Sequence, residues 1–239
     1  MNQIRQPLKA FYSTKTSACD YFADRLESKT VTDLNGRDAQ VWANVLSRAG
    51  FRRSHGLCYI PACPNCRACI SVRIRAHDFV LSKAMKKIIH RNEFTHLSVV
   101  PNIATAEQYE LFKRYLSARH AGGEMEKMRY EEYRAMIEES PIETDLFELR
   151  EQGTLIAVML IDVFDDGYSA VYSFFDPSFG KRSLGTFMIL ELIRRTKEAH
   201  KPYVYLGYLI KGLSNMAYKG RFEPLEYYAG GEWTASFPD

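Results

Sequence analysis

Four of the five cysteines lie within twelve residues, and their spacing is the clearest chemical signal in the chain. Cys63, Cys66 and Cys69 follow one another at intervals of three residues. This spacing suits ligation of Zn or an iron–sulfur cluster, because thiolates in a short loop can converge on one ion. Cys19 or Cys58 is the candidate fourth ligand. The alternative is a loop of reduced thiols, and an odd cysteine count argues against a disulfide framework.

Basic residues are concentrated in one segment, although the formal net charge of the whole chain is only +3. Ten basic and two acidic residues lie between Arg48 and Glu93, a net +8 that leaves −5 elsewhere. Such a surface can neutralise several phosphates, and the absence of a base-reading motif favours a backbone or RNA-end contact over a sequence-specific DNA reader. The alternative is a solvated basic face. The residues assigned to this RNA contact are Arg52, Arg53, Arg73, Arg75, Lys83, Lys86, Lys87 and Arg91.

Hydrophobic periodicity predicts the elements that position these residues. Residues 1–102 form an N-terminal region with the cysteines and the basic segment, and residues 103–239 form a C-terminal catalytic domain. In the N-terminal region we expect a helix within 33–50 with its apolar stripe on Val41, Trp42, Val45 and Leu46, extended chain over 51–62, a half-buried strand over 70–75, a helix over 82–92 capped by Ser82, and a short strand at 97–101. The C-terminal domain is expected to begin with a helix opened by Thr105 and Gln108 and a second helix at 130–140, followed by three strands between 144 and 176. It should end with a helix over 183–200, with Arg194 on its buried side, and strands at 202–208 and 224–233.

This order of elements resembles the acyl-CoA N-acyltransferase (GNAT) fold, an α+β or α/β arrangement with a mixed sheet and flanking helices. A coenzyme-A enzyme of that fold grips a pyrophosphate with a glycine-rich loop at a helix N-terminus. Arg182 and Gly185 fit the usual pattern, but Phe187 stands where a small residue is expected. The loop therefore supports the fold and argues against the usual cofactor.

The chain has the composition of a globular protein, with 46% hydrophobic and 26% charged residues. No apolar run approaches the ~20 residues of a membrane-spanning helix, and the N-terminus lacks the apolar core of a signal peptide. We therefore expect a cytoplasmic protein with neither a membrane nor a DNA partner.

Several longer stretches are similar to one family, the bacterial aspartate/glutamate leucyltransferases. They are the segment from Cys58 to Ile74, Arg114 to His120, Ser169 to Pro177, RSLGTF, PYVYLGY with IKG, and YKGRFEPLE through Trp233. Members are aminoacyl-tRNA–protein transferases of the N-degron pathway, related to eukaryotic arginyltransferases. Two departures stand out: lysines occupy the 83–87 stretch where arginines are common, and Asp20 follows Cys19.

The resemblance implies a reaction in which leucine moves from its tRNA ester to the α-amino group of a protein beginning with Asp or Glu. The ester is already activated, so no cofactor is required. The enzyme must then position both reactants, deprotonate an amine with a pKa of ~7.7–8.0 and stabilise an oxyanion. The proposed base is Asp176, and Tyr172 or Tyr208 is the proposed donor to the oxyanion or the leaving oxygen. The cations available to the acceptor's carboxylate are Arg182, Lys211, Lys219 and Arg221, of which Arg221 is favoured.

Three other functions stay open on sequence grounds. The first is an arginyl-tRNA–protein transferase with the same acceptors. The second is a CoA-dependent N-acetyltransferase. The third is a non-catalytic zinc or RNA module.

Overall fold

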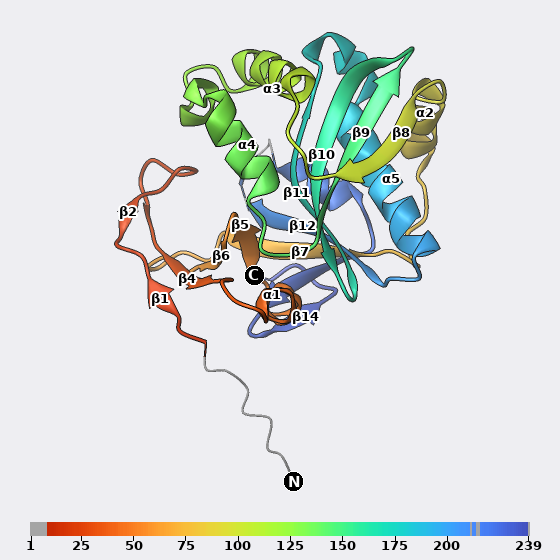
Figure 1. Cartoon of the computed structure of the whole chain (residues 1–239). Coiled ribbons are helices and arrows are strands. Elements are labelled where there is room, and N and C mark those ends of the chain that lie inside the picture. Colours follow the sequence, from red (N-terminus) through yellow and green to blue (C-terminus); the bar gives the residue numbers. More distant parts are fainter. Residues whose placement is uncertain (1–8, 211, 214–215, 239) are drawn as a thin grey trace.

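A single large β-sheet forms the centre of the molecule (Figure 1). The computed structural model describes residues 9–210, 212–213 and 216–238. Within this part of the chain, the sheet has eight strands in the order β14-β13-β7-β12-β11-β10-β9-β8. Their bounds are β7 (Cys69–Arg75), β8 (His96–Pro101), β9 (Thr144–Glu151), β10 (Thr154–Phe164), β11 (Gly167–Phe175), β12 (Tyr203–Ile210), β13 (Leu225–Ala229) and β14 (Glu232–Thr234).

The strand order agrees with the predicted fold class. β9, β10 and β11 form an antiparallel meander, joined at Gly153 and by the Asp166-Gly167 turn as expected. The next strand, β12, runs parallel to β11 and is reached through the long helix α5 (Leu184–Glu198). A meander followed by a helix and a returning parallel strand is the expected N-acyltransferase-like arrangement.

Helices cover both faces of this sheet. They are α1 (Ala39–Arg48), α2 (Lys83–Arg91), α3 (Ala106–Arg119), α4 (Tyr130–Glu138) and α5, with short 3-10 helices η1 (Glu124–Lys127), η2 (Pro177–Arg182) and η3 (Ala217–Arg221). Along β10, Met159 and Ile161 belong to the same buried cluster as residues of α5, whereas Val158 and Leu160 pack with α3 and α4. Alternate side chains of one strand therefore enter two cores, as the pleat requires.

A smaller sheet lies beside the large one and is built from the N-terminal region. Its order is β1-β4-β6-β5, with bounds β1 (Tyr12–Ser13), β4 (Lys29–Asp33), β6 (Leu57–Pro61) and β5 (Arg52–Ser54). A separate hairpin pairs β2 (Ser17–Ala18) with β3 (Leu26–Glu27). The helix α1 packs Leu46 into a third cluster with Phe164 and Tyr205, which joins the small sheet to the large one.

Two predicted helix starts are confirmed in detail. The Ser82 hydroxyl accepts a hydrogen bond from the Met85 amide at 3.3 Å and opens α2. Thr105 and Gln108 form a reciprocal capping box at the start of α3. Because these side chains satisfy amides that the helix itself leaves unpaired, the helix boundaries were readable from the sequence.

Several predictions need correction. β7 is buried on both faces, because it lies inside the sheet between β12 and β13 and is not a half-buried strand. In α1, Val41 and Val45 are exposed, and the helix buries Ala39 and Ala43 with Leu46. Arg194 is also exposed on α5.

The expected final strand is a hairpin, because Gly230 and Gly231 turn the chain between β13 and β14. The expected division at residue 102 does not separate two sheets, since β7 and β8 precede it and pair with later strands. No helix among the described residues is long and apolar enough to cross a membrane.

Candidate active site

The parallel strands β11 and β12 pair only at their beginnings. Their register runs from Gly167 opposite Tyr203 to Ser169 opposite Tyr205, and beyond this point each strand continues without the other. We call the diverging parts, residues 170–175 of β11 and 206–210 of β12, the fork. The predicted catalytic residues Tyr172 and Tyr208 lie on its two arms, and Asp176 follows the end of β11.

Arg52 of β5 places its guanidinium inside the fork. Its Nη2 donates to the carbonyl oxygens of Ala170 at 3.2 Å and Val171 at 3.5 Å, just past the last paired residues of β11. On the opposite arm Gly207 leaves room for it, because a Cβ there would lie 1.7 Å from Arg52 Nη1. The side chain thus takes the place of a strand partner for β11. Arg52 was expected to contact RNA, and the structure instead places its guanidinium between two strands.

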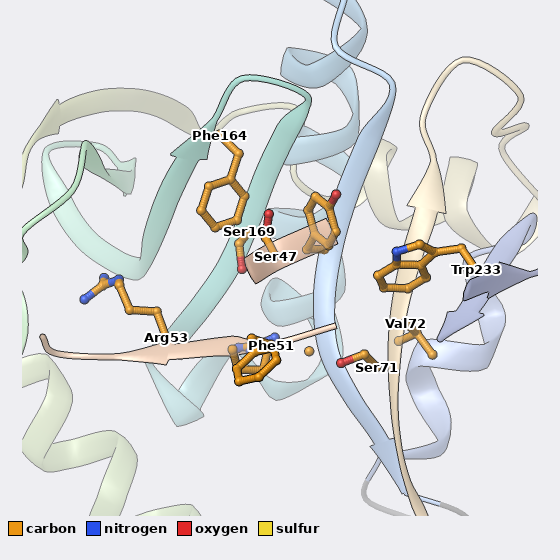
Figure 2. Close-up of a pocket in the computed structure, with 11 residues that line it drawn as sticks. Ser47, Phe51, Arg53, Ser71, Val72, Phe164, Ser169 and Trp233 are labelled. Carbon is orange, nitrogen blue, oxygen red and sulfur yellow. The ribbon is translucent and has the colours of Figure 1, made fainter. Parts of the chain in front are cut away.

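A small cavity adjoins the paired end of the fork (Figure 2). Its volume is about 10 Å³, enough for one water molecule and too small for a substrate. Ser169, Gly207 and Arg52 line it together with residues of α1 and β14. The Nη1 atom of Arg52 is buried and has no hydrogen-bond partner among the described residues. The fork therefore keeps one unsatisfied cationic donor in its interior.

Lys219 of η3 is also buried at the fork. Its side chain donates from Nζ to the carbonyl oxygen of Tyr208 at 2.6 Å, and only 7% of the residue is exposed. Burial, together with the charge of Arg52 as the smaller cause, lowers the pKa of Lys219 to about 7. Lys219 was predicted to bind the acceptor's carboxylate as a cation. The structure corrects this role, because the amine is enclosed and its charged form is disfavoured.

The two tyrosines of the fork are hydrogen-bond donors that stay protonated. Burial raises the pKa of Tyr208 and of Tyr172 well above the usual value for a phenol. The Tyr208 hydroxyl donates to the carbonyl oxygen of Tyr59 at 2.9 Å. Tyr172 contacts Phe112 of α3 edge-to-face, with 6.1 Å between ring centroids. Because the Tyr208 hydroxyl is engaged by Tyr59 while the Tyr172 hydroxyl has no hydrogen-bond partner in the described part of the chain, Tyr172 has the freer hydroxyl.

Asp176 caps the short helix η2. Its Oδ1 accepts from the Ser178 amide at 2.9 Å and from the Ser178 hydroxyl at 2.6 Å, and its Oδ2 lies 3.4 Å from Nη2 of Arg114. Partial burial raises the pKa of this carboxyl, but the bonds from Ser178 and the charge of Arg114 outweigh it, so the pKa falls below its ordinary value. Such a carboxylate is a weak base for an amine.

The four predicted acceptor-binding cations have different surroundings. Arg182 is held by Glu151 at 2.7 Å and by Asn92 at 3.1 Å, so its guanidinium ties η2 to β9 and to the end of α2. Lys211 lies outside the described residues. Arg221 is exposed on η3 and forms no hydrogen bond or ion pair within the described part of the chain. Arg221 is accordingly the best placed of the four to meet a carboxylate.

Two residues of the predicted RNA surface are structural. Arg53 forms a bidentate ion pair with Asp162, at 2.8 and 2.5 Å, and both side chains are almost fully buried. Arg73 stacks 3.5 Å from the Tyr203 ring centroid and pairs with Glu226 at 2.7 Å. Neither guanidinium can reach an RNA from these positions, which corrects the prediction for both.

The remaining basic residues are at the surface. Arg75 is exposed and pairs with the neighbouring Asp78 at 3.2 Å. Lys83, Lys86 and Lys87 are exposed on α2, and so is Arg91, which donates to the carbonyl oxygen of Lys181 at 3.2 Å. The helix α2 therefore keeps a continuous basic face, and its contact with RNA stays a prediction.

The cysteine loop borders a second cavity of about 340 Å³, which Tyr208 also lines. Burial raises the pKa of Cys69, and the charges of Cys63, Cys66 and Cys19 raise it as well. In the described part of the chain, however, no three His, Cys, Asp or Glu side chains converge in a metal-binding arrangement. Cys58 is buried in the cluster beneath α1 and is unsuited to the site. Metal or cluster binding by the other four stays a prediction.

Cys66 should be the most readily alkylated of three cysteines with contrasting surroundings. The Ala68 amide and the Arg25 guanidinium, 3.3 Å from the sulfur, lower the pKa of Cys66. Burial raises the pKa of Cys69 to about 11 and that of Cys58 to about 12. Since the thiolate is the reacting species, iodoacetamide at pH 7 should modify Cys66 first, as read by peptide mass spectrometry. Arg25→Gln should slow Cys66 labelling, and equal rates at Cys58 would contradict the assignment.

Comparison with known proteins places the chain in a family. The family model "Arginine-tRNA-protein transferase, N terminus" matches residues 17–87, and the model for the C terminus matches residues 107–229. The aspartate/glutamate leucyltransferase of Paramagnetospirillum magneticum is 49% identical, over 97% of both chains. That of Gluconacetobacter diazotrophicus is 48% identical, over 96% of this chain and 88% of its own. The chain belongs to the aspartate/glutamate leucyltransferase family.

Membership in the aspartate/glutamate leucyltransferase family makes the chain an aminoacyltransferase. Among solved structures, L-PGS from Bacillus licheniformis is similar with a TM-score of 0.47 and 12% identity, covering 77% of this chain and 55% of that one. A likeness of this size carries no conclusion about function. The family resemblance drawn from the motifs is confirmed.

Sequence reasoning missed three contributors to the site. Arg52 was counted only as part of a basic run, although Gly207 within PYVYLGY marks a strand position where another group comes close. Arg114 and Tyr115 of α3 were quoted as a motif without a role. Arg114 pairs with Asp176, and Tyr115 packs edge-to-face on Phe175, with 5.1 Å between centroids. Nothing in the sequence pairs α3 with the end of β11.

Proposed function

We propose that this aminoacyltransferase moves leucine from leucyl-tRNA to the α-amino group of proteins that begin with Asp or Glu, which marks them for N-degron degradation. The observation that carries the proposal is the near-complete alignment, at 44–49% identity, with curated relatives named for this acceptor and donor pair. The predicted motifs fall within the matched segments, except that the last one continues past residue 229 to Trp233.

The fork is the proposed site of acyl transfer. The donor is an activated ester, so the enzyme's work is to bring ester and amine together and to stabilise the oxyanion of the tetrahedral intermediate. Tyr172 supplies a protonated hydroxyl on one arm of the fork. Arg221 on η3 supplies an exposed guanidinium, whose planar set of N–H donors matches the acceptor's carboxylate. The chemistry requires no cofactor, and Zn or an iron–sulfur cluster at Cys63, Cys66, Cys69 and Cys19 would serve a structural role.

The occupied fork disfavours binding of an acyl-CoA donor. Arg52 already takes the backbone carbonyls of Ala170 and Val171, which a bound ligand chain would otherwise meet. Phe187 is buried at the start of α5, where the usual cofactor loop has a small residue. These two side chains support an aminoacyl ester as the donor over an acyl-CoA.

The experiment that tests the proposed function uses two charged tRNAs and three peptides. Purified protein is mixed with labelled leucyl-tRNA or arginyl-tRNA and with peptides that begin with Asp, Glu or Lys. We expect leucine on the Asp and Glu peptides and none on the Lys peptide. Transfer of arginine alone would retain the reaction class and replace the donor. No transfer from either tRNA would overturn the proposal.

The basic face of α2 is the proposed tRNA contact. Changing Lys83, Lys86 and Lys87 to Glu should weaken tRNA binding and make it less dependent on salt, since each lost phosphate contact lowers the slope of log K against log salt by about 0.7–0.9. For three contacts the slope should fall by roughly 2–3. The binding constant is measured by filter binding at several salt concentrations.

The matched control changes three exposed basic residues elsewhere by the same total charge. Lys127, Arg129 and Arg134 lie on and next to α4, and all three are exposed. Their replacement by Glu should lower affinity only through the long-range effect of net charge. Equal losses in the two triple variants would show that α2 is a solvated face.

A further inference from the structure

The cavity beside the cysteine loop, which we call the large cavity, has the size of a ligand site. Its volume is about 340 Å³, within the range of small-molecule sites in proteins. It lies next to the fork, because Tyr208 on one arm of the fork lines it. Ser71 of β7 pairs with Tyr208 across the sheet and lines both this cavity and the small one beside Arg52. A group bound in the large cavity therefore lies beside the strand that carries one arm of the fork.

The large cavity offers a mainly apolar surface to a ligand. The Tyr208 hydroxyl donates to the carbonyl oxygen of Tyr59 at 2.9 Å, and the Ser71 hydroxyl donates to that of Gly50 at 2.5 Å. Both hydroxyl protons are therefore already used within the protein. Most of the remaining wall consists of aliphatic and aromatic side chains, those of Ile60, Pro61, Ala68, Ile70, Tyr228 and Ala229. Such a wall suits a branched aliphatic group, because binding there removes apolar surface from water.

The charges around the large cavity disfavour a cationic ligand. No Asp or Glu is among its described lining residues, and Arg67, which is exposed, forms no ion pair within the described part of the chain. Cys66 also borders the cavity, but its sulfur already accepts from the Arg25 guanidinium at 3.3 Å. An arginyl side chain that entered would give up water, meet no carboxylate and face a like charge. A leucyl side chain carries no charge and avoids all three costs.

We infer that the large cavity holds the side chain of the amino acid being transferred, and that its apolar walls and Arg67 select leucine over arginine. This inference rests on the proposed function and deepens it, because it assigns the subsite that recognises the donor's amino acid. The aminoacyl ester extends from the cavity past Tyr208 to the fork, where acyl transfer takes place. The amino acid is thus recognised apart from the tRNA, whose proposed contact is the basic face of α2.

Two variants that fill the large cavity from different walls test its ligand. Ala68 lies in the cysteine loop before β7, and Ala229 is the last residue of β13. Ala68→Leu and Ala229→Leu each add a branched aliphatic group where the leucyl side chain would lie. A single tRNA that carries either leucine or alanine keeps the tRNA contacts constant. Each variant should lower the ratio of kcat/KM for leucine to that for alanine by about 10–200-fold, the range for one methylene group in an apolar pocket.

Ala62→Leu is the matched control for the filling variants. Ala62 follows β6 and is close to the lining residues in sequence, but it is exposed and is not part of the lining. This variant should keep the leucine-to-alanine ratio within about twofold of the wild type. An unchanged ratio in both filling variants would overturn the inference. So would a higher KM for the Asp peptide with an unchanged donor ratio, because the cavity would then serve the acceptor.

Reversing the charge of Arg67 tests how the cavity discriminates against arginine. In Arg67→Glu an arginyl group would meet an attractive charge in place of a repulsive one. On one tRNA charged with arginine or leucine, the ratio of kcat/KM for arginine to that for leucine should rise by about tenfold, as expected for an exposed pair changed from repulsion to attraction. Arg37→Glu makes the same change of net charge at an exposed position outside the lining, and should leave the ratio unchanged. The same ratio in both variants would contradict selection by Arg67.

Binding of a donor analogue separates this inference from the proposed function, because it needs no transfer. The probes are 3′-(leucylamino)-3′-deoxyadenosine and its arginyl counterpart, in which an amide replaces the reactive ester. In equilibrium dialysis the wild type should bind the leucyl probe at least about tenfold more tightly than the arginyl probe, and Ala68→Leu should remove most of this difference. Equal affinities in the wild type would overturn the inference even when leucine transfer is observed. Preferential binding without transfer to any peptide would support the leucyl subsite and refute the proposed function.

Discussion

Arg53→Met should lower the free energy of unfolding by roughly 3–5 kcal/mol, because it leaves the Asp162 carboxylate buried without its cation. The side chains of Arg53 and Asp162 are 3% and 1% exposed. Arg53 also donates from Nη1 to the His55 carbonyl at 2.9 Å, so the guanidinium links β5 to its own turn as well as to β10. The loss should appear as a midpoint of thermal unfolding lower by roughly 6–20 °C.

Arg75→Met is the control for Arg53→Met. Arg75 pairs with Asp78 on the surface, where both side chains are about half exposed. A surface pair of this kind contributes about 0–1 kcal/mol, so the control should unfold within a few degrees of the wild type. If the two variants had the same midpoint, the Arg53–Asp162 pair would not hold the small sheet against the large one.

Gly207→Ala should lower the free energy of unfolding by roughly 2.5–5 kcal/mol. Gly207 has φ of +78°, where an L-residue costs about 1–2 kcal/mol. The added Cβ would also lie 1.7 Å from Nη1 and 2.3 Å from Cζ of Arg52, so the guanidinium must leave the fork. It then gives up its bonds to β11, and a hydrogen bond from a charged group contributes about 1.5–3 kcal/mol. Urea denaturation measures the change.

Gly153→Ala supplies the matched control for the backbone term. Gly153 turns the chain between β9 and β10 with φ of +82°, and nothing lies within 4 Å of the Cβ that alanine would add. This variant should lower the free energy of unfolding only by the conformational cost of about 1–2 kcal/mol. The difference between the two alanine variants then measures the displacement of Arg52. A difference near zero would show that the guanidinium moves aside without loss.

Local signals in the sequence predicted most of the fold. The capping residues Ser82 and Thr105 and the turns at Gly153 and Gly167 act over a few neighbouring positions, so they appear in the order of the residues. The prediction that β7 is half-buried was wrong, because residues far along the chain cover its second face. Alternation of Ile70, Val72 and Ile74 with polar residues is typical of a strand with one solvent-exposed face. Arg73, however, is buried by aromatic rings from β12 and β14.

The chemical roles of charged residues were harder to predict than the elements that carry them. A basic run in the sequence does not show that Arg53 meets Asp162, 109 residues away, or that Arg52 lies between β11 and β12. Lys219 and Arg221 are two positions apart on η3, yet one is buried and the other exposed. Pairing across the chain decides which cations stay at the surface, and the acceptor-binding role of Arg221 stays a prediction.

The position of β7 has a consequence for dividing this protein into pieces. The two matched family segments read as separate modules, but β7 comes from the first and sits between β12 and β13 of the second. A fragment covering residues 103–239 would present two bare strand edges on either side of a missing neighbour, and exposed edges of this kind invite association with other chains. We therefore expect that neither half can be exchanged between relatives alone, and that the two would recover a common sheet only when produced together.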